Sequence, residues 1–222
     1  MNPIAKRTIS ALTIAALVVL AIVKAPLWLF PYAFGALAVL SVVECAQLVA
    51  RRRSLLSPGG LAVFVPWVLL IVLAFSTLPA IALLRGGEGS LLMLYVIAIV
   101  KISDMGGFAA GLSTAKLMKG GNHKMCPTIS PNKSWEGLAG SVAASCILSC
   151  CFMPVTQFGW PKALGFGVAA ALLGTAGDLI ESKLKRWAGV KDSATFLPAG
   201  MGGFLDMFDS LLIAPFVLYW FL

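Results

Sequence analysis

The feature that most constrains this chain is a series of long apolar segments that runs from end to end. Polar or Gly/Pro-rich residues separate the segments, and each segment is close to the length of a membrane-spanning helix. About 20 mostly apolar residues are needed to span the hydrocarbon, where a helix satisfies its own backbone hydrogen bonds. We therefore predict an all-α, polytopic membrane bundle of about seven transmembrane helices, at residues 8–23, 28–50, 60–84, 90–112, 137–156, 162–181 and 205–222.

The first apolar segment has two interpretations. Lys6 and Arg7 precede it, as basic residues precede the apolar part of a signal peptide. No clear cleavage site between small residues follows, however, and the next apolar segment begins at once. We therefore interpret residues 8–23 as a retained span.

Composition excludes two other classes of protein. Hydrophobic residues make up 59% of the chain and charged residues 12%, which is too apolar for a soluble domain or a disordered chain. The chain has 17 basic and 9 acidic residues, and topology explains the difference. With the N-terminus in the cytoplasm, most basic residues fall in cytoplasmic loops, as the positive-inside rule requires. We therefore expect a bilayer environment and no nucleic-acid partner.

The acidic residues gather in the second half of the chain. The first hundred residues contain only Glu44 and Glu88. An ionisable group near the end of a membrane helix usually marks a functional site, because burying it is costly. We therefore predict one continuous membrane domain, with N-terminal transmembrane helices of little chemistry at 1–97 and nearly all of the chemistry at 98–222. The acids of that second region are Asp104, Glu136, Asp178, Glu181, Asp192, Asp206 and Asp209.

Two acidic motifs share the template D-x-x-[DE]-S, at residues 178–182 and 206–210. Residues at positions i, i+3 and i+4 lie on one face of a helix, so each motif presents two carboxylates and a hydroxyl together. If the two faces meet, the crowded negative charge requires a cation or protonation. Oxygen ligands beside substrate phosphates favour Mg²⁺. The alternative is an ordinary interfacial network, in which these acids pair with nearby lysine and arginine residues.

Basic and glycine-rich segments flank the acidic motifs. Lys183, Lys185, Arg186 and Lys191 follow the first motif, and cations beside a metal site suit a polyphosphate substrate. The glycine-rich segment 200–203 precedes the second motif. Such glycines either let the backbone approach an anion or simply form a loop.

The polar segment 113–136 contains a further candidate group. Ser130 followed by Pro131 has the pattern of a helix N-cap with proline at the first helical position. That structural interpretation leaves Lys133 and Glu136 unexplained. Asp104 likewise has no packing role near the end of its apolar segment.

Three blocks of residues occur together in the order of a known family. Residues 182–193 read S-x-x-K-R-x-x-x-x-K-D-S, and L-D-x-x-D-S follows at 205–210. A second block is I-S-P-x-K-S-W-E-G at 129–137, and a third has Asp104 with glycines at 106 and 111 around Phe108. Together they resemble the phosphatidate cytidylyltransferases, also called CDP-diacylglycerol synthases. The resemblance covers residues 98–222, which it marks as the catalytic region.

The resemblance implies an integral membrane nucleotidyltransferase that condenses CTP with phosphatidic acid, releasing pyrophosphate and leaving CDP-diacylglycerol for phospholipid synthesis. It also implies a metal centre in which Asp178 and Asp206 hold Mg²⁺. A homodimer in a bacterial inner membrane, with the site facing the cytoplasm, fits the same family. The expected catalytic residues are Asp178, Ser182, Lys191, Asp192, Asp206 and Asp209, and the expected substrate-binding residues are Asp104, Ser130, Lys133, Lys183, Arg186, Gly202 and Gly203.

Two departures from the family pattern keep other functions open. The family turn usually reads P-G-H-G-G followed by L-D-R, whereas this chain has Met201 and Met207 in place of the histidine and the arginine. One alternative is therefore a cytidylyltransferase that acts on another lipid phosphate. The other is a transporter or scaffold that shares the ancestry without the catalysis.

Overall fold

Long apolar helices dominate the computed structural model, which describes residues 19–222 apart from 21, 85–87, 119–120, 192 and 194–202. Within the described part, four helices are long and apolar enough to cross a membrane. A shorter apolar helix, α5, covers Trp135–Cys151. The protein is thus an all-α integral membrane protein, as predicted. The four long helices are α2 (Leu29–Ala50), α3 (Pro58–Leu84), α4 (Gly89–Leu117) and α7 (Trp160–Trp187).

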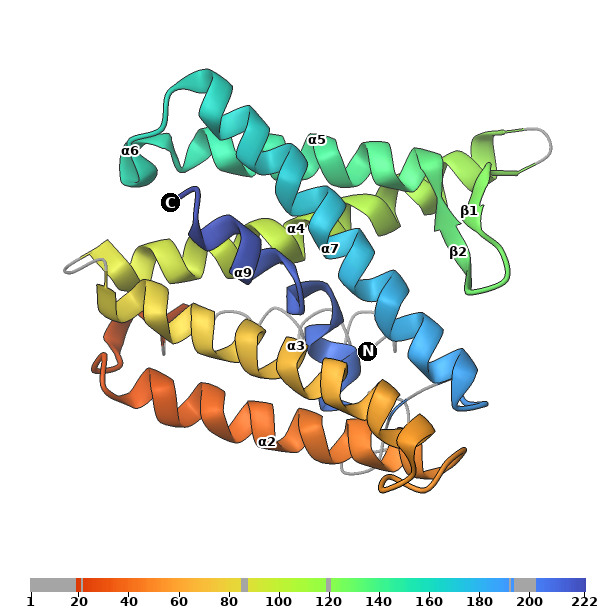
Figure 1. Ribbon diagram of the computed structural model, residues 1–222. Helices are drawn as coiled ribbons and strands as arrows, with labels where there is room; N and C mark the ends of the chain where they lie inside the picture. Colours follow the sequence, from red (N-terminus) through yellow and green to blue (C-terminus); the bar gives the residue numbers. More distant parts are fainter. Residues whose placement is uncertain (1–18, 21, 85–87, 119–120, 192, 194–202) are drawn as a thin grey trace, which may run out of the picture.

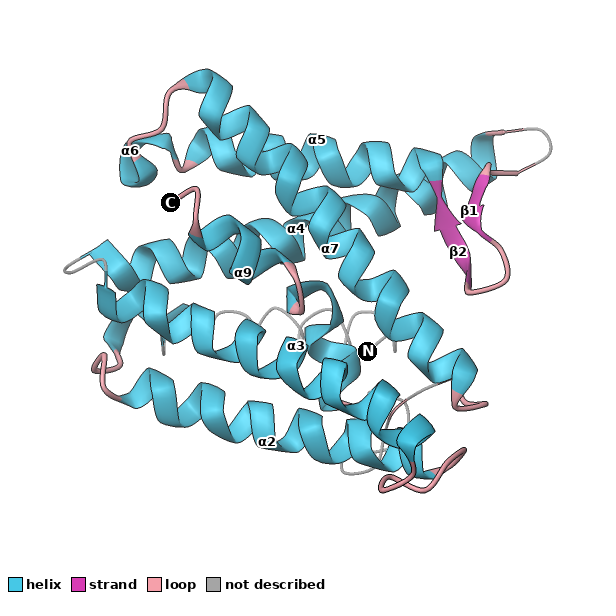
Figure 2. Ribbon diagram, viewed as in Figure 1, coloured by secondary structure: helices cyan, strands magenta, loops and turns pink. Residues whose placement is uncertain are grey.

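The remaining elements are short. Strands β1 (Lys124–Cys126) and β2 (Ser130–Ser134) form an antiparallel hairpin between α4 and α5, and the hairpin projects from one end of the bundle (Figure 2). In its register, Lys124 lies opposite Ser134 and Cys126 opposite Ser130. The short helices are α6 (Met153–Thr156), α8 (Phe204–Phe208), the 3-10 helix η2 (Asp209–Leu211) and α9 (Ala214–Tyr219).

Neighbouring helices pack in chain order from α2 to α5, and α7 crosses this layer (Figure 1). Helix α7 contacts both α4 and α5, while α8 packs against α2 and η2 against α7. Tyr95 of α4 is fully buried between the rings of Phe152 and Phe166, and its hydroxyl lies 2.7 Å from Ser149 Oγ. This stacked aromatic group, with the contact to Ser149, joins α4 to α7 and to the end of α5.

The predicted spans agree with the structure in four cases and differ in others. Segments 28–50, 60–84, 90–112 and 162–181 correspond to α2, α3, α4 and α7. Most of segment 8–23 lies outside the described residues, and 137–156 is helical mainly as the shorter α5. The total of seven spans therefore stays a prediction.

The prediction of one continuous helix at 205–222 is wrong, because the structure divides this segment into α8, η2 and α9. Pro215 lies in the first turn of α9, and proline cannot donate the hydrogen bond that would continue a preceding helix. The backbone at Asp209 also approaches α7 closely. A Cβ atom added at Gly177 would lie 2.5 Å from the Asp209 carbonyl oxygen, so the missing side chain there allows η2 to contact α7.

The predicted N-cap at Ser130 is also wrong. Ser130 begins β2, and the N-cap of α5 is Ser134, whose Oγ accepts a hydrogen bond from the Gly137 amide at 3.1 Å. Ser134 has the extended backbone that an N-cap requires. Hairpin pairing with β1 holds Pro131 in a strand, so the helix begins after the hairpin.

Glycines allow α4 and α5 to pack closely, as small residues commonly do between membrane helices. A Cβ atom added at Gly106 would lie 2.7 Å from the Gly140 carbonyl oxygen, and one added at Gly140 would lie 2.7 Å from the Gly106 carbonyl oxygen. Backbone therefore faces backbone at this crossing, with no flexible side chain that could move aside.

We expect Gly140→Ala to destabilise the protein by about 1–3 kcal/mol, because the added methyl group overpacks a backbone contact. Gly165→Ala is the matched control, since Gly165 lies within α7 and a Cβ atom added there would meet nothing within 4 Å. Alanine is the better helix former, so that control is expected to be neutral or stabilising by up to about 1 kcal/mol. Thermal unfolding in detergent measures both. An equal change in the two variants would contradict close packing at Gly140.

Candidate active site

A cavity of about 400 Å³ lies where the hairpin and the helices α4, α5, α7, α8 and η2 meet. Glycine and serine residues of α4 and α5 form part of its wall. Charged side chains come from elements far apart in the sequence, so only the tertiary structure brings them together. The charged residues that line the cavity are Lys101, Asp104, Lys133, Asp178, Asp206 and Asp209.

Three carboxylates form a tight cluster at this cavity. Asp178 and Glu181 come from α7 and Asp209 from η2, and one oxygen of each lies within 4.8 Å of the others. Glu181 is fully buried, whereas the other two are half-buried. Burial and the neighbouring Asp178 carboxylate raise the pKa of Asp209, which lies in the short helix η2, to about 7. A set of crowded carboxylate oxygens fits a hard divalent cation such as Mg²⁺.

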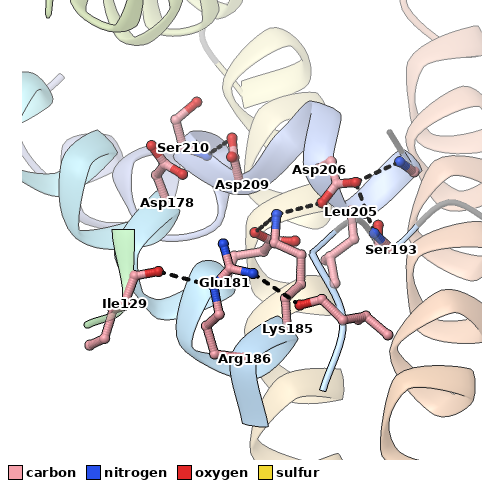
Figure 3. A network of polar contacts seen from close by, with 12 residues as sticks. Ile129, Asp178, Glu181, Lys185, Arg186, Ser193, Leu205, Asp206, Asp209 and Ser210 are labelled. Atoms are coloured by element: carbon pink, nitrogen blue, oxygen red, sulfur yellow. Dashed lines mark hydrogen bonds and ion pairs between the residues drawn. The ribbon is translucent and has the colours of Figure 1, made fainter. Parts of the chain in front are cut away.

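Asp206 lies beside this cluster but is held differently (Figure 3). Its Oδ1 accepts a hydrogen bond from Lys185 Nζ at 2.7 Å, and its Oδ2 accepts from the amides of Gly203 at 2.7 Å and Ser193 at 3.0 Å. Burial alone would raise the pKa of Asp206, but its contacts with Glu181, with Lys185 and with the Gly203 amide lower the pKa to about 2. Lys185 also pairs with Glu181 at 2.6 Å. Lys185 therefore joins the first acidic motif to the second.

The hairpin supplies a basic group to the cavity. Lys133 of β2 forms an ion pair with Asp178, and Ser130 at the start of β2 lines the same cavity. His123 Nδ1 lies 2.6 Å from Glu136 Oε1 at the base of the hairpin. The hydrogen bond from His123 lowers the pKa of Glu136. Glu136 therefore has a structural role in joining the hairpin to α5.

Sequence reasoning missed two charged residues of the long helices. Lys101 Nζ donates to the Met207 carbonyl at 2.9 Å and to Ser210 Oγ at 3.0 Å, and it lies 3.9 Å from Asp104. Glu44 is fully buried on α2 and accepts hydrogen bonds from the first amides of α8. The signal in the sequence was a lone charge inside an apolar segment, which is rare without a functional or pairing role.

Several predicted site residues lie outside the cavity lining. Ser182 is half-buried, Lys183 and Lys191 are exposed, and Arg186 donates to the carbonyl oxygens of Ile129 and Val190, each at 3.3 Å. Gly203 is the N-cap of α8. The functional roles of these residues stay predictions. The predicted residues Asp192 and Gly202, and the divergent Met201, lie outside the described residues.

The alternative of an interfacial charge network describes part of the arrangement. Glu181 and Asp206 share Lys185, and Asp178 pairs with Lys133. These pairs leave excess negative charge, because Asp209 joins the cluster without a lysine or arginine among the described ion pairs. Pairing and cation binding are therefore compatible at this site.

Comparison with known proteins gives a consistent result. The model of the cytidylyltransferase family matches residues 59–222. The phosphatidate cytidylyltransferase of Haemophilus influenzae is 38% identical over 141 residues, covering 60% of this chain and 46% of that protein. That of Staphylococcus aureus (strain COL) is 41% identical over 128 residues, covering 56% and 46%. That of Mycobacterium bovis is 42% identical over 120 residues, covering 53% and 36%.

The matched regions thus span less than half the length of these curated relatives. The family match, in contrast, covers most of this chain and includes every charged residue that lines the cavity. The protein belongs to the cytidylyltransferase family.

Proposed function

We propose that this protein transfers the CMP moiety of CTP to phosphatidic acid. An oxygen of the lipid phosphate attacks the α-phosphorus of CTP, and the bond from that phosphorus to the oxygen bridging to the β-phosphorus breaks. Pyrophosphate leaves, and CDP-diacylglycerol remains. The observation that carries the proposal is the cavity in which carboxylates of α7, α8 and η2 face lysines of α4 and β2.

The cavity supports this chemistry in two ways. Its volume of about 400 Å³ lies within the range of about 300–1,000 Å³ that is usual for ligand sites. Lys101 and Lys133 provide positive charge on the wall that a triphosphate would contact. Phosphoryl-type transfer depends mainly on alignment and charge neutralisation, so a protein nucleophile is not required.

The carboxylates fit Mg²⁺ as the cofactor. We assign Asp178 and Asp206 as ligands. The carboxylates of Asp178, Glu181 and Asp209 lie within 4.8 Å of one another, so we propose Asp209 and Glu181 as further candidate ligands beside Asp178. Mg²⁺ bound here would neutralise charge on the phosphates of CTP and on the departing pyrophosphate. Lys133 contacts Asp178, so it is placed to hold a phosphate bound to the same metal ion as this carboxylate.

Location follows from charge and membrane topology. The matched relatives are bacterial proteins, and basic residues are enriched in cytoplasmic loops of membrane proteins. We therefore propose a bacterial inner membrane with the cavity at the cytoplasmic face, where CTP is available. Subunit pairing as a homodimer stays a prediction of the family resemblance.

The test is an assay of purified protein with CTP, Mg²⁺ and phosphatidic acid. We expect pyrophosphate and CDP-diacylglycerol in equal amounts, and we expect EDTA to abolish both and excess Mg²⁺ to restore them. A parallel panel with other lipid phosphates, including a polyprenyl phosphate, identifies the acceptor. Pyrophosphate release with none of these lipids would favour the transporter or scaffold alternative.

Replacing the carboxylates individually tests their role. We expect Asp178→Asn, Asp206→Asn and Asp209→Asn each to lower kcat by about 10²–10³-fold, because each weakens the binding of the Mg²⁺ that neutralises phosphate charge in the transition state. Glu88→Gln is the control, since Glu88 is exposed at the start of α4 and its side chain caps nothing there. Near-normal kcat in a correctly inserted Asp178→Asn variant would exclude the assigned role.

The two hairpin lysines provide a matched pair for substrate binding. Lys133 lines the cavity, whereas Lys124 is exposed on β1 and lies outside the lining. We expect Lys133→Ala to raise the KM for CTP by about tenfold, which is the usual scale for losing one charge-assisted hydrogen bond. Lys124→Ala is expected to change KM by less than about twofold, as surface charges contribute little. Steady-state kinetics measures both, and similar KM values in the two variants would contradict a role for Lys133.

A further inference from the structure

Glu44 is a buried acid that the reaction described above does not use. It lies on α2, outside the residues 59–222 that match the family model. Glu44 and Glu181 are the fully buried acids among the described residues. An acid buried in an apolar helix is costly unless its oxygens have hydrogen-bond partners. Its partners therefore indicate what it does.

Those partners are the amides that begin α8. Glu44 Oε1 accepts from the Phe204 amide at 3.0 Å, and Oε2 accepts from the Leu205 amide at 2.9 Å. The first amides of a helix have no partner within the helix. The N-cap residue, Gly203, has no side chain to accept them. Glu44 therefore supplies, from a distant helix, the acceptor that an N-cap side chain normally provides, and its charge suits the helix N-terminus.

Gly203 is the residue that permits this contact. A Cβ atom added there would lie 2.5 Å from Glu44 Oε2 and closer still to Ser193 Oγ, so a side chain at 203 would displace both groups. A local N-cap serine or aspartate at this position would thus move Glu44 and Ser193 away from the positions they hold here. The glycine at 203 therefore serves the approach of α2 and not only the flexibility of a loop.

The same helical turn positions Asp206. Asp206 Oδ2 accepts the amide of Gly203 at 2.7 Å and the amide of Ser193 at 3.0 Å. The Ser193 hydroxyl in turn donates to Glu44 Oε2 at 3.4 Å. Glu44 and Asp206 thus hold one turn through adjacent amides and share Ser193 as a common partner. A shift of that turn would move the Asp206 carboxylate within the cavity.

We propose that Glu44 is a positioning residue for nucleotidyl transfer, which holds α8 so that Asp206 is aligned in the cavity. The inference rests on the proposed function. Glu44 lies outside the cavity lining, so it acts through α8 and not on the substrate. It makes α2, which precedes the family-matched region, a component of the active site.

The experiment compares wild-type protein with Glu44→Gln and Glu44→Ala in lipid nanodiscs. Glutamine keeps one acceptor oxygen but places its carboxamide NH₂, a donor, against the second backbone amide, whereas alanine removes both acceptors. We expect kcat to fall by about tenfold in the glutamine variant and by about a hundredfold in the alanine variant, as misalignment of a reacting group commonly does. The KM for phosphatidic acid is expected to change by less than about twofold, because the lipid does not contact Glu44. Glu88→Ala is the matched control for removal of an acid from the first hundred residues.

Hydrogen exchange of the peptide 203–211, without substrate, provides a readout independent of turnover. We expect exchange of the first α8 amides to become about tenfold faster in Glu44→Gln, because a charge-assisted hydrogen bond is lost. Exchange in α5 is expected to stay unchanged. A local change at α8 together with the graded loss of kcat supports positioning.

Three results would overturn the inference. Unchanged kcat in both Glu44 variants would show that Asp206 does not depend on Glu44. Faster exchange throughout the protein in both variants would make Glu44 a residue for general stability. Unchanged exchange at 203–211 would show that Glu44 does not hold α8. If wild-type protein itself releases no pyrophosphate, the proposed function fails and the catalytic part of this inference with it, while the exchange measurement still decides whether Glu44 holds α8.

Discussion

A carboxylate buried among apolar helices must find hydrogen-bond donors or an opposite charge, and this requirement organises one end of the bundle. Glu44 meets it at the amides of α8, and Asp206 meets it at Lys185 and at the same turn. Lys185 also neutralises part of the charge of Glu181. Because these partners belong to α2, α7 and α8, satisfying the charges also determines where the three helices lie relative to one another.

The cavity is a consequence of that arrangement. Helix α8 is too short to cross a membrane, and η2 turns Asp209 toward Asp178 of α7. Lys101 of α4 holds the end of α8 by donating to the Met207 carbonyl, and the end of a helix is a favourable place for a cation. A short helix held at its start by an acid and at its end by a base thus presents its own carboxylate to the cavity. The remaining excess of negative charge suits a divalent cation, and such a cation, together with Lys101 and Lys133, would suit a polyphosphate.

The sequence predicted which residues gather at the cavity better than it predicted how the backbone arranges them. The spacing in residues 178–182 and 206–210 predicted two acidic motifs at one site, and members of both motifs line one cavity, while their functional roles stay predictions. It treated the second motif as one face of a continuous helix, but Pro215 and the contact at Gly177 divide that segment. It assigned Ser130 to a helix, since a strand of five residues leaves little periodic signal. It gave Glu44 no role, because the partners of Glu44 are backbone amides about 160 positions away, and no side-chain pattern marks a backbone donor.

The amino-acid sequence by itself determined the membrane-spanning class, the apolar helices α2, α3, α4 and α7, and the residue types available for chemistry, because apolar length and charge are local properties of a chain. The tertiary structure decided which charges share a cavity and which are held elsewhere. Lys133 reaches Asp178, while Lys183 and Lys191 face outward. Which lysine reaches the cavity depends on where the helices cross and on the close glycine contacts between them. These contacts join residues from separate segments, so they form only when the whole bundle packs.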